Sequence, residues 1–260
     1  MIGAGRGRDS RCREDAHPSH TTGRLGERSR RNRGAVEPVY VMTKAWLKPL
    51  LAVWFRWSVR GAENIPREGA AILAVNHIAF LDPFAAAYVV AGRKRRPRFL
   101  AKSELFEDKR IGWLLRSLGQ IEVRRGTATA PMTLDHAVDA LSRSEVVVVF
   151  PEGTITDEPD LSPMAPKTGA ARLALKSGAP LIPCALWGTQ NVWPKGFAKH
   201  WRPRQRIFVA VGEPLDVHGD ADASDAWDET GEKLMSAIGN LLEGLRPELP
   251  DRRRPKRRAA

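Results

Sequence analysis

The stretch that decides the fold is AILAVNHIAFLDPFAAAYVV, residues 71–90. Its first five residues, 71–75, are all apolar and predict a short buried strand. Asn76 and His77 follow directly, and a second apolar run at 84–90 predicts a helix. We therefore expect a strand, a polar loop and a helix in immediate succession.

The same alternation continues to about residue 245. The run VVVVF at 146–150 predicts a strand buried on both faces. The predicted strands are 71–75, 98–101, 120–123, 146–150, 179–186 and 206–211, and the predicted helices are 84–90, 110–118, 131–143, 167–177 and 222–244. Strands that alternate with helices predict an α/β domain, with a central, largely parallel sheet flanked by helices.

Size and charge limit the kinds of function. The chain has 260 residues, enough for one sizeable domain, and a formal net charge of +12. That charge favours an anionic partner: nucleic acid, an anionic membrane surface or a phosphorylated substrate. Two cysteines give no disulfide framework and no metal-ligand spacing, so a reducing cytoplasm is the expected compartment. The sequence has no secretory apolar region near its start and no apolar stretch of roughly 18 residues to span a bilayer.

The two ends differ in composition from the middle. Residues 1–41 are rich in Arg, Gly, Ser and Asp without hydrophobic periodicity, so we expect a disordered basic arm. One hypothesis is that translation starts at Met42, where the first ordered-looking segment begins. Residues 246–260 end in the basic run DRRRPKRRAA and are expected to be a second disordered tail. The folded domain is expected at 61–245.

An amphipathic segment is predicted at 42–60. Apolar residues recur in it at helical spacing and cations flank them: Trp46, Leu50, Val53, Trp54 and Trp57, with Lys44, Lys48 and Arg56. Tryptophan beside cations suits the headgroup region of a membrane, so we expect this segment to lie on a membrane surface. The alternative is an ordinary amphipathic helix docked on the core.

Polar groups follow four of the predicted strands. They are Asn76 and His77 after the first, Lys102 after the second, Arg124 and Arg125 after the third, and Glu152 to Thr154 after the strand at 146–150. Ligands bind at the carboxyl ends of the strands in open α/β sheets. We expect these groups to converge on one site if the four strands are parallel neighbours.

The spacing of His77 and Asp82 excludes a shared helix face, because five residues turn a helix by about 140°. Asp82 precedes Pro83, so the helix is expected to begin at Pro83 with Asp82 as its N-cap. A loop over 76–82 can then fold the carboxylate back to the imidazole, fixing its tautomer and leaving the other nitrogen as a base. The alternative is a helix cap and an unrelated core histidine.

The remaining polar groups have two interpretations each. Arg125 suits bidentate phosphate recognition, and Lys102 is a similar cation, but either is equally a solvated surface charge. Glu152 follows a buried strand, where a carboxylate needs a partner, so a structural ion pair is its alternative role. Gly153 and Thr154 offer an exposed amide and a hydroxyl, or simply form a turn.

Together these residues resemble the motifs of the glycerolipid acyltransferases, the group that contains bacterial 1-acylglycerol-3-phosphate acyltransferases. The similar segments are 76–82 (NHIAFLD, like NHxxxxD), 119–125 (GQIEVRR), 150–154 (FPEGT) and 181–184 (LIPC), with AKSEL at 101–105 similar to a lysine-bearing segment between the first two. The resemblance covers about 42–220. One motif alone is weak, but four in order at proper separation are a specific signal.

The resemblance implies an acyltransferase of phospholipid biosynthesis. It implies transfer of a fatty acyl group from acyl-CoA or acyl-carrier protein to the sn-2 hydroxyl of 1-acylglycerol 3-phosphate, without a metal or prosthetic group. By it, His77 and Asp82 are catalytic. The residues expected to bind substrate are Asn76, Lys102, Arg125, Glu152, Gly153 and Thr154. We also expect backbone N–H groups near the 76–82 turn to stabilise the oxyanion.

One departure from the family pattern concerns the acceptor. The third block usually continues Glu-Gly-Thr-Arg-Ser, whereas here Ile155 stands at the arginine position. The missing arginine is expected near the acceptor phosphate, so either Arg124, Arg125 or Lys102 replaces it or the acceptor is a different lyso-lipid. The enzyme is expected to be peripheral on the cytoplasmic face of the cell membrane.

Two other classes of function remain open at this point. The +12 charge suggests a nucleic-acid-binding protein, but the cations concentrate in the two flanks and no nucleic-acid motif is present, so no specific nucleic acid is expected. A hydrolase using the same His–Asp pair on water is the other alternative. No GxSxG elbow supports it.

Overall fold

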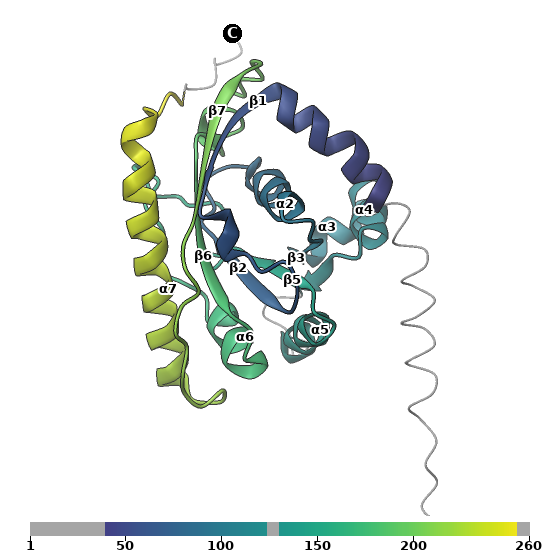
Figure 1. Ribbon diagram of the computed structural model, residues 1–260, viewed down its shortest axis with the longest axis vertical. Coiled ribbons are helices and arrows are strands. Elements are labelled where there is room, and N and C mark those ends of the chain that lie inside the picture. Colours follow the sequence, from purple (N-terminus) through teal and green to yellow (C-terminus); the bar gives the residue numbers. More distant parts are fainter. Residues whose placement is uncertain (1–39, 124–129, 254–260) are drawn as a thin grey trace, which may run out of the picture.

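The computed structural model describes residues 40–123 and 130–253, which form one central sheet with helices on both faces (Figure 1). The sheet has seven strands in the order β1-β7-β6-β2-β5-β3-β4. Every neighbouring pair is parallel except β6 and β7, which are antiparallel. The expected α/β fold with a largely parallel sheet is therefore confirmed.

The elements follow the sequence pattern closely. The strands are β1 Phe55–Arg60, β2 Ala71–Val75, β3 Pro97–Lys102, β4 Ile121–Val123, β5 Val146–Val149, β6 Leu181–Trp187 and β7 Gln205–Val211. A helix over residues 40–54 precedes them. The other helices are α2 Asp82–Gly92, α3 Ser103–Glu107, α4 Ile111–Ser117, α5 Ala130–Ser142, α6 Gly169–Ser177 and α7 Ser224–Leu245, with short 3-10 turns η1 Ala62–Asn64, η2 Thr189–Asn191 and η3 Arg246–Glu248.

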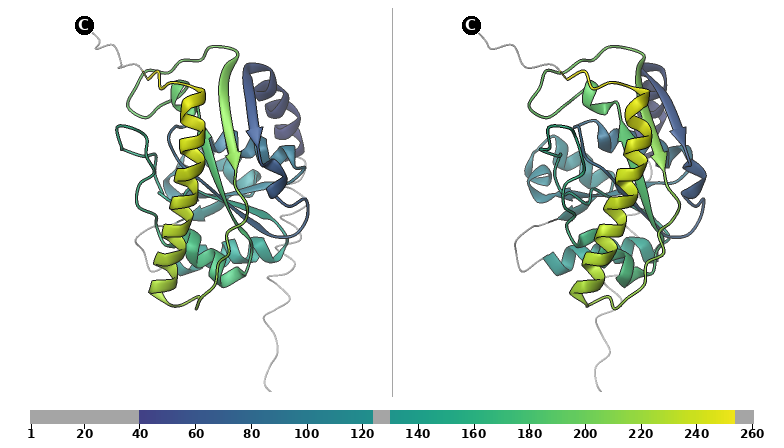
Figure 2. Two further views of the ribbon diagram at one scale, coloured as in Figure 1. Left: turned by 60° about the vertical axis from the view of Figure 1, so that its left-hand side comes forward. Right: turned by 90° about the vertical axis from the view of Figure 1, so that its left-hand side faces the viewer.

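Alternating side chains of β2 pack into two different core clusters. On β2, Leu73 and Val75 pack with the helix over 40–54 and with α2. Ile72 and Ala74 point the other way and pack with α5, α6 and α7. Both faces of β2 are therefore covered, as its wholly apolar sequence requires. Figure 1 shows α7 on one side of the sheet and α2 on the other, and Figure 2 shows α7 running across its face.

Three boundaries differ from the sequence-based expectation. The amphipathic segment predicted at 42–60 is a helix only to residue 54, and 55–60 form strand β1, which pairs with β7 inside the domain. The domain therefore begins before residue 61. The helix predicted at 110–118 is preceded by a separate short helix, α3. None of the helices in the described part of the chain is both long enough and apolar enough to cross a membrane.

The expected tail at 246–260 is ordered over its first part. Residues 246–248 form η3, and the Leu249 carbonyl accepts a hydrogen bond of 2.6 Å from Trp187 Nε1. The Asn191 side chain donates to the Pro250 carbonyl and accepts from the Arg252 N–H. These contacts tie the segment to η2, which sequence composition alone did not indicate. Of the arm expected at 1–41, residues 40 and 41 belong to the helix over 40–54, and residues 1–39, like residues 254–260, lie outside the described residues.

Candidate active site

The sheet order brings the predicted site residues to one edge. β2, β5, β3 and β4 are consecutive and mutually parallel, so His77 and Glu152 follow the carboxyl ends of β2 and β5, and Lys102 is the last residue of β3. At roughly 4.8 Å per strand, the end of β3 lies about 10 Å from the end of β2. The condition for the predicted convergence, parallel neighbouring strands, is therefore met for the described strands, and the meeting of all these side chains at one site stays a prediction. Arg124 and Arg125, predicted after β4, lie outside the described residues.

Asn76 anchors the start of the loop over residues 76–82. Its side-chain amide is fully buried, donates to the Leu186 carbonyl at 3.1 Å and accepts from the Leu186 N–H at 2.7 Å. The amide thus continues the β2–β6 pairing with side-chain atoms where the backbone turns away from the sheet. Its predicted contact with substrate stays a prediction, and these bonds define its role within the protein.

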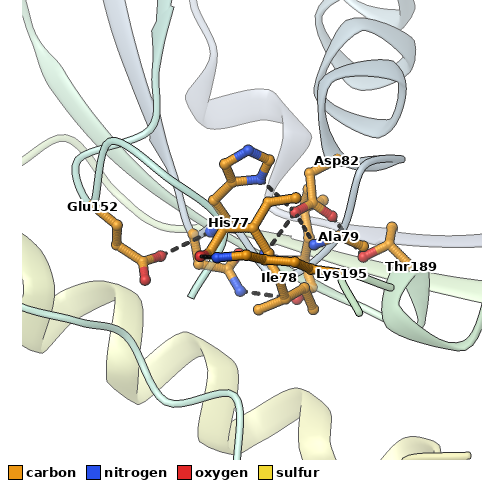
Figure 3. Close-up of polar contacts among 10 residues, drawn as sticks. His77, Ile78, Ala79, Asp82, Glu152, Thr189 and Lys195 are labelled. Carbon is orange, nitrogen blue, oxygen red and sulfur yellow. Dashed lines mark hydrogen bonds and ion pairs between the residues drawn. The ribbon is translucent and has the colours of Figure 1, made fainter. Parts of the chain in front are cut away.

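Asp82 folds back onto the loop, as the spacing required (Figure 3). Its Oδ2 lies 2.9 Å from His77 Nδ1 and accepts hydrogen bonds from the Ile78 and Ala79 N–H groups at 2.7 and 2.8 Å. Asp82 is not an N-cap as predicted: it is the first residue of α2, preceded by Leu81 at the cap position. Its carboxylate serves the loop before the helix rather than the helix itself.

Thr189 completes the shell around this carboxylate, and sequence reasoning missed it. Its hydroxyl donates to Asp82 Oδ1 at 2.6 Å, and both side chains are fully buried. Thr189 follows Gly188 directly after β6, and Gly188 has a φ of 102°, a left-handed conformation that favours glycine. The signal was available, because Thr189 follows a strand end just as the other site residues do.

The imidazole of His77 is fixed in orientation. Its ring stacks on Phe150, with centroids 4.2 Å apart and an interplanar angle of 25°. The side chain is 15% exposed, whereas that of Asp82 is 0% exposed. With Nδ1 facing the carboxylate, Nε2 is the ring nitrogen left for a proton transfer with a bound molecule.

Glu152 supports the loop from the other side. Its two oxygens accept hydrogen bonds from the His77 N–H at 2.8 Å and the Met164 N–H at 3.1 Å. Burial raises the pKa of the Glu152 carboxyl, although the Met164 and His77 N–H groups oppose that shift. Its predicted contact with substrate stays a prediction, and the ion pair with Arg125 involves a residue outside the described range.

The turn after β5 matches its sequence. Gly153 has a φ of 74°, and its N–H donates to the Phe150 carbonyl at 2.9 Å, which closes the turn. A side chain at this position would be strained, so glycine is required. Thr154 is exposed beside it. Their predicted contacts with substrate stay predictions.

Two lysines lie in segments at the carboxyl end of the sheet. Lys102 is exposed at the end of β3. Lys195, which the sequence analysis did not single out, places Nζ 3.5 Å from the Ile155 carbonyl and 2.6 Å from Asp157 Oδ1. Thr156, which follows Ile155, donates its N–H to the His77 carbonyl at 2.7 Å, so the Lys195 ammonium lies close to the 76–82 loop (Figure 3).

The expected oxyanion donors are occupied. The N–H groups of His77, Ile78, Ala79 and Phe80 donate to Glu152, to Asp82 twice, and to the Trp193 carbonyl, respectively. These groups hold the loop rigid and have no proton free for a substrate oxygen. The expectation that they form an oxyanion hole is therefore wrong for these four groups.

Comparisons with known proteins identify the family of this chain. A family model described as Acyltransferase matches residues 56–187. A chloroplastic 1-acyl-sn-glycerol-3-phosphate acyltransferase of Brassica napus is 27% identical over 60% of this chain and 44% of its own length. The 1-acyl-sn-glycerol-3-phosphate acyltransferase of Bacillus subtilis (strain 168) is also 27% identical, over 65% of this chain and 78% of its own length.

A solved structure has the same fold. The crystal structure of the 1-acyl-sn-glycerophosphate acyltransferase PlsC from Thermotoga maritima aligns with a TM-score of 0.58 and 25% sequence identity, covering 82% of each chain. The plant and algal relatives are longer proteins. The chain spans 44%, 62% and 50% of three of them, or about half their length.

Proposed function

The chain belongs to the acyltransferase family, and on that premise we propose that it transfers a fatty acyl group to the sn-2 hydroxyl of 1-acylglycerol 3-phosphate, giving phosphatidate. The observation that carries the proposal is the pairing of His77 Nδ1 with the buried Asp82 carboxylate at the end of β2. The pairing directs Nε2 of a partly exposed imidazole outward. The names of the relatives supply the acceptor class.

The reaction needs one base and no protein nucleophile. His77 Nε2 takes the proton from the acceptor hydroxyl while that oxygen attacks the thioester carbonyl carbon of acyl-CoA or acyl-carrier protein. The carbon–sulfur bond then breaks, and the imidazolium returns the proton to the leaving thiolate. His77 ends the cycle neutral, so the proton and the acyl group are both accounted for.

The role of Asp82 follows from its burial. A carboxylate that is fully buried 2.9 Å from Nδ1 stabilises the imidazolium formed during the reaction and holds the ring in one tautomer. Thr189 and the Ile78 and Ala79 N–H groups hold the carboxylate in its orientation through hydrogen bonds. Glu152 positions the same loop through the His77 N–H.

We assign binding of the acceptor phosphate to cations at the carboxyl end of the sheet. Ile155 is buried and supplies no charge at the position where the family usually has arginine. Lys195 contributes a cation beside the Ile155 carbonyl, and Lys102 contributes another at the end of β3. Arg125, outside the described residues, remains a further predicted phosphate ligand.

We propose that the helix over 40–54 brings the enzyme to its lipid substrates. Trp46 is 80% exposed on it, and Leu50 and Val53 are exposed nearby, so an apolar stripe faces away from the core. Lys44 and Lys48 flank that stripe. A helix of this kind lies in the headgroup region of a membrane, so we assign the enzyme to the cytoplasmic surface of the cell membrane as a peripheral protein.

An acceptor panel tests the proposal. Lysophosphatidate, glycerol 3-phosphate and a lysophospholipid with a choline headgroup are each incubated with one labelled acyl-CoA and the full chain. We expect labelled product with lysophosphatidate in clear preference, and loss of product in a folded His77→Ala variant. Preference for another acceptor would contradict the substrate assignment, and release of free fatty acid alone would indicate a hydrolase.

A further inference from the structure

A cluster of aromatic rings borders the loop over residues 76–82, which carries the proposed catalytic residues and is called the catalytic loop below. The Phe80 ring, within the 76–82 segment itself, lies 5.6 Å from that of Trp193, which lies 5.6 Å from that of Trp201. Phe80 and Trp201 are 46% and 47% exposed, although both are large apolar side chains. The outer rings of the cluster therefore face solvent in the described structure, beside the residues assigned to catalysis.

Backbone contacts join this cluster firmly to the loop. The Phe80 N–H donates to the Trp193 carbonyl at 3.0 Å, and Ala79 and Pro194 form an isolated antiparallel bridge. Ala79 in turn donates its N–H to Asp82. The aromatic cluster is therefore attached through Ala79 and Phe80 to the same loop that carries His77.

The segment that carries Trp193 and Trp201 is basic and contains no acidic residue. Residues 187–212 contain no Asp or Glu, and their cations are Lys195, Lys199, Arg202, Arg204 and Arg206. Lys199 Nζ lies 4.4 Å from the centre of the Trp193 ring, and Arg202 is exposed beside Trp201. Lys195 is paired with Asp157, and the exposed rings lie beside the remaining cations. Exposed aromatic rings beside cations are typical of surfaces that meet anionic headgroups.

The cluster also adjoins the helix over 40–54. The Arg204 N–H donates to the Trp54 carbonyl at 2.6 Å, at the last turn of that helix. Trp54 and Trp193 pack against the same core. Val53, next to Trp54, is strongly exposed. Two separate stretches of sequence, both aromatic and basic, therefore meet near the end of this helix, where β1 starts beside β7 (Figure 1).

We propose that Phe80, Trp193, Lys199, Trp201 and Arg202 form a second membrane-binding surface that contacts anionic phospholipid headgroups and holds the catalytic loop at the lipid–water interface. A bilayer fits better than an acidic protein because exposed rings lie among the cations and because the surface adjoins the apolar stripe of the helix over 40–54. The proposal rests on the proposed function only for its choice of a lipid partner.

Vesicle sedimentation of the full chain tests it. The probes are phosphatidylcholine vesicles with and without phosphatidylglycerol. The variants are the double charge reversal Lys199→Glu with Arg202→Glu, and Trp201→Ala, each checked for folding by circular dichroism. The matched control is Lys176→Glu with Lys233→Glu, which reverses two exposed cations on α6 and α7 that pair with Asp135 and Glu229 and not with any residue of the cluster.

We expect the Lys199/Arg202 reversal to weaken partitioning onto anionic vesicles at least about tenfold, since each juxtamembrane cation contributes several-fold to affinity. Trp201→Ala should weaken binding to both kinds of vesicle, and the control should bind almost as wild type. Acyl transfer to a monomeric short-chain lysophosphatidate should survive in all of them. Loss of membrane binding by this surface can then be told apart from loss of the acyl-transfer reaction.

Three results would overturn the proposal. The first is wild-type partitioning by the Lys199/Arg202 variant. The second is an equal loss in the control, which would indicate net charge rather than this surface. The third is loss of binding to an acidic carrier protein or to nucleic acid in the Lys199/Arg202 variant while vesicle binding is retained, since that would identify a different partner.

Discussion

Replacing Thr189 with valine removes one hydroxyl and little else, because the two side chains have the same shape. The hydroxyl donates to Asp82 Oδ1 at 2.6 Å in a fully buried setting. Asp82 Oδ2 keeps its three contacts, to His77 Nδ1 and to the Ile78 and Ala79 N–H groups. The variant therefore removes a hydrogen bond from one oxygen of the carboxylate while the histidine contact is left in place.

The size of the effect follows from the charge on the acceptor. A hydrogen bond to a charged group contributes about 1.5–3 kcal/mol, so the unfolding free energy of Thr189→Val should fall by that amount. If the same bond holds the carboxylate against His77, kcat should fall by about 10-fold to 100-fold, since roughly 1.4 kcal/mol corresponds to a factor of ten. KM should change little, because Thr189 is buried behind Asp82.

The assay is steady-state acyl transfer with both substrates varied, together with urea unfolding of each variant. Thr189→Ser is the matched control: it keeps the hydroxyl and loses one buried methyl group, which costs about 1 kcal/mol of stability. It should recover most of kcat although it too is destabilised. A wild-type kcat in Thr189→Val, or an equally slow Thr189→Ser, would refute the role of the hydroxyl in positioning Asp82.

Three further predictions concern the rest of the site. Asn76→Ala should lower the unfolding free energy by about 2–4 kcal/mol in urea titrations, because two buried backbone groups of Leu186 lose their partners; stability equal to wild type would contradict this. Glu152 has a pKa raised above its unfolded value of about 4.5, so the stability that it contributes is present below that pH and is lost as pH rises through the folded-state pKa. The unfolding free energy of wild type minus that of Glu152→Gln should therefore fall from pH 4.5 to pH 8, and a rising difference would show the sign to be wrong. Lys195→Ala should raise KM for lysophosphatidate by about two- to tenfold with kcat little changed, whereas Lys176→Ala should alter neither; identical kinetics in the two would remove Lys195 from the acceptor site.

Local patterns predicted most of the fold. Wholly apolar strands such as 71–75 and 146–149 lie at the centre of the sheet, because a strand covered on both faces has no position for a polar side chain. The sequence did not indicate that β7 runs antiparallel to β6 or that 55–60 form an edge strand. Those features depend on pairings between distant segments, and spacing along the chain does not encode them.

The site residues that were predicted came from one rule, that polar residues follow the ends of strands, and the residues that were missed were those to which it was not applied. Polar residues after strand ends identified His77 and Glu152, and the same rule applied to β6 would have pointed to Thr189. Lys195 had no such signal, since its place depends on the bridge between Ala79 and Pro194. For Asp82, the sequence predicted that the carboxylate folds back to His77. It did not predict that the carboxylate accepts hydrogen bonds from the loop N–H groups instead of capping the helix.

The most direct test of the account is the acyl-transfer rate of His77→Ala, measured with labelled acyl-CoA and lysophosphatidate in a variant shown to be folded by circular dichroism. A general base contributes about 100-fold to 10,000-fold, so the account predicts a loss of that size, with lipid binding retained. A folded His77→Ala protein that transfers the acyl group at the wild-type rate would contradict the central claim that this imidazole activates the acceptor hydroxyl.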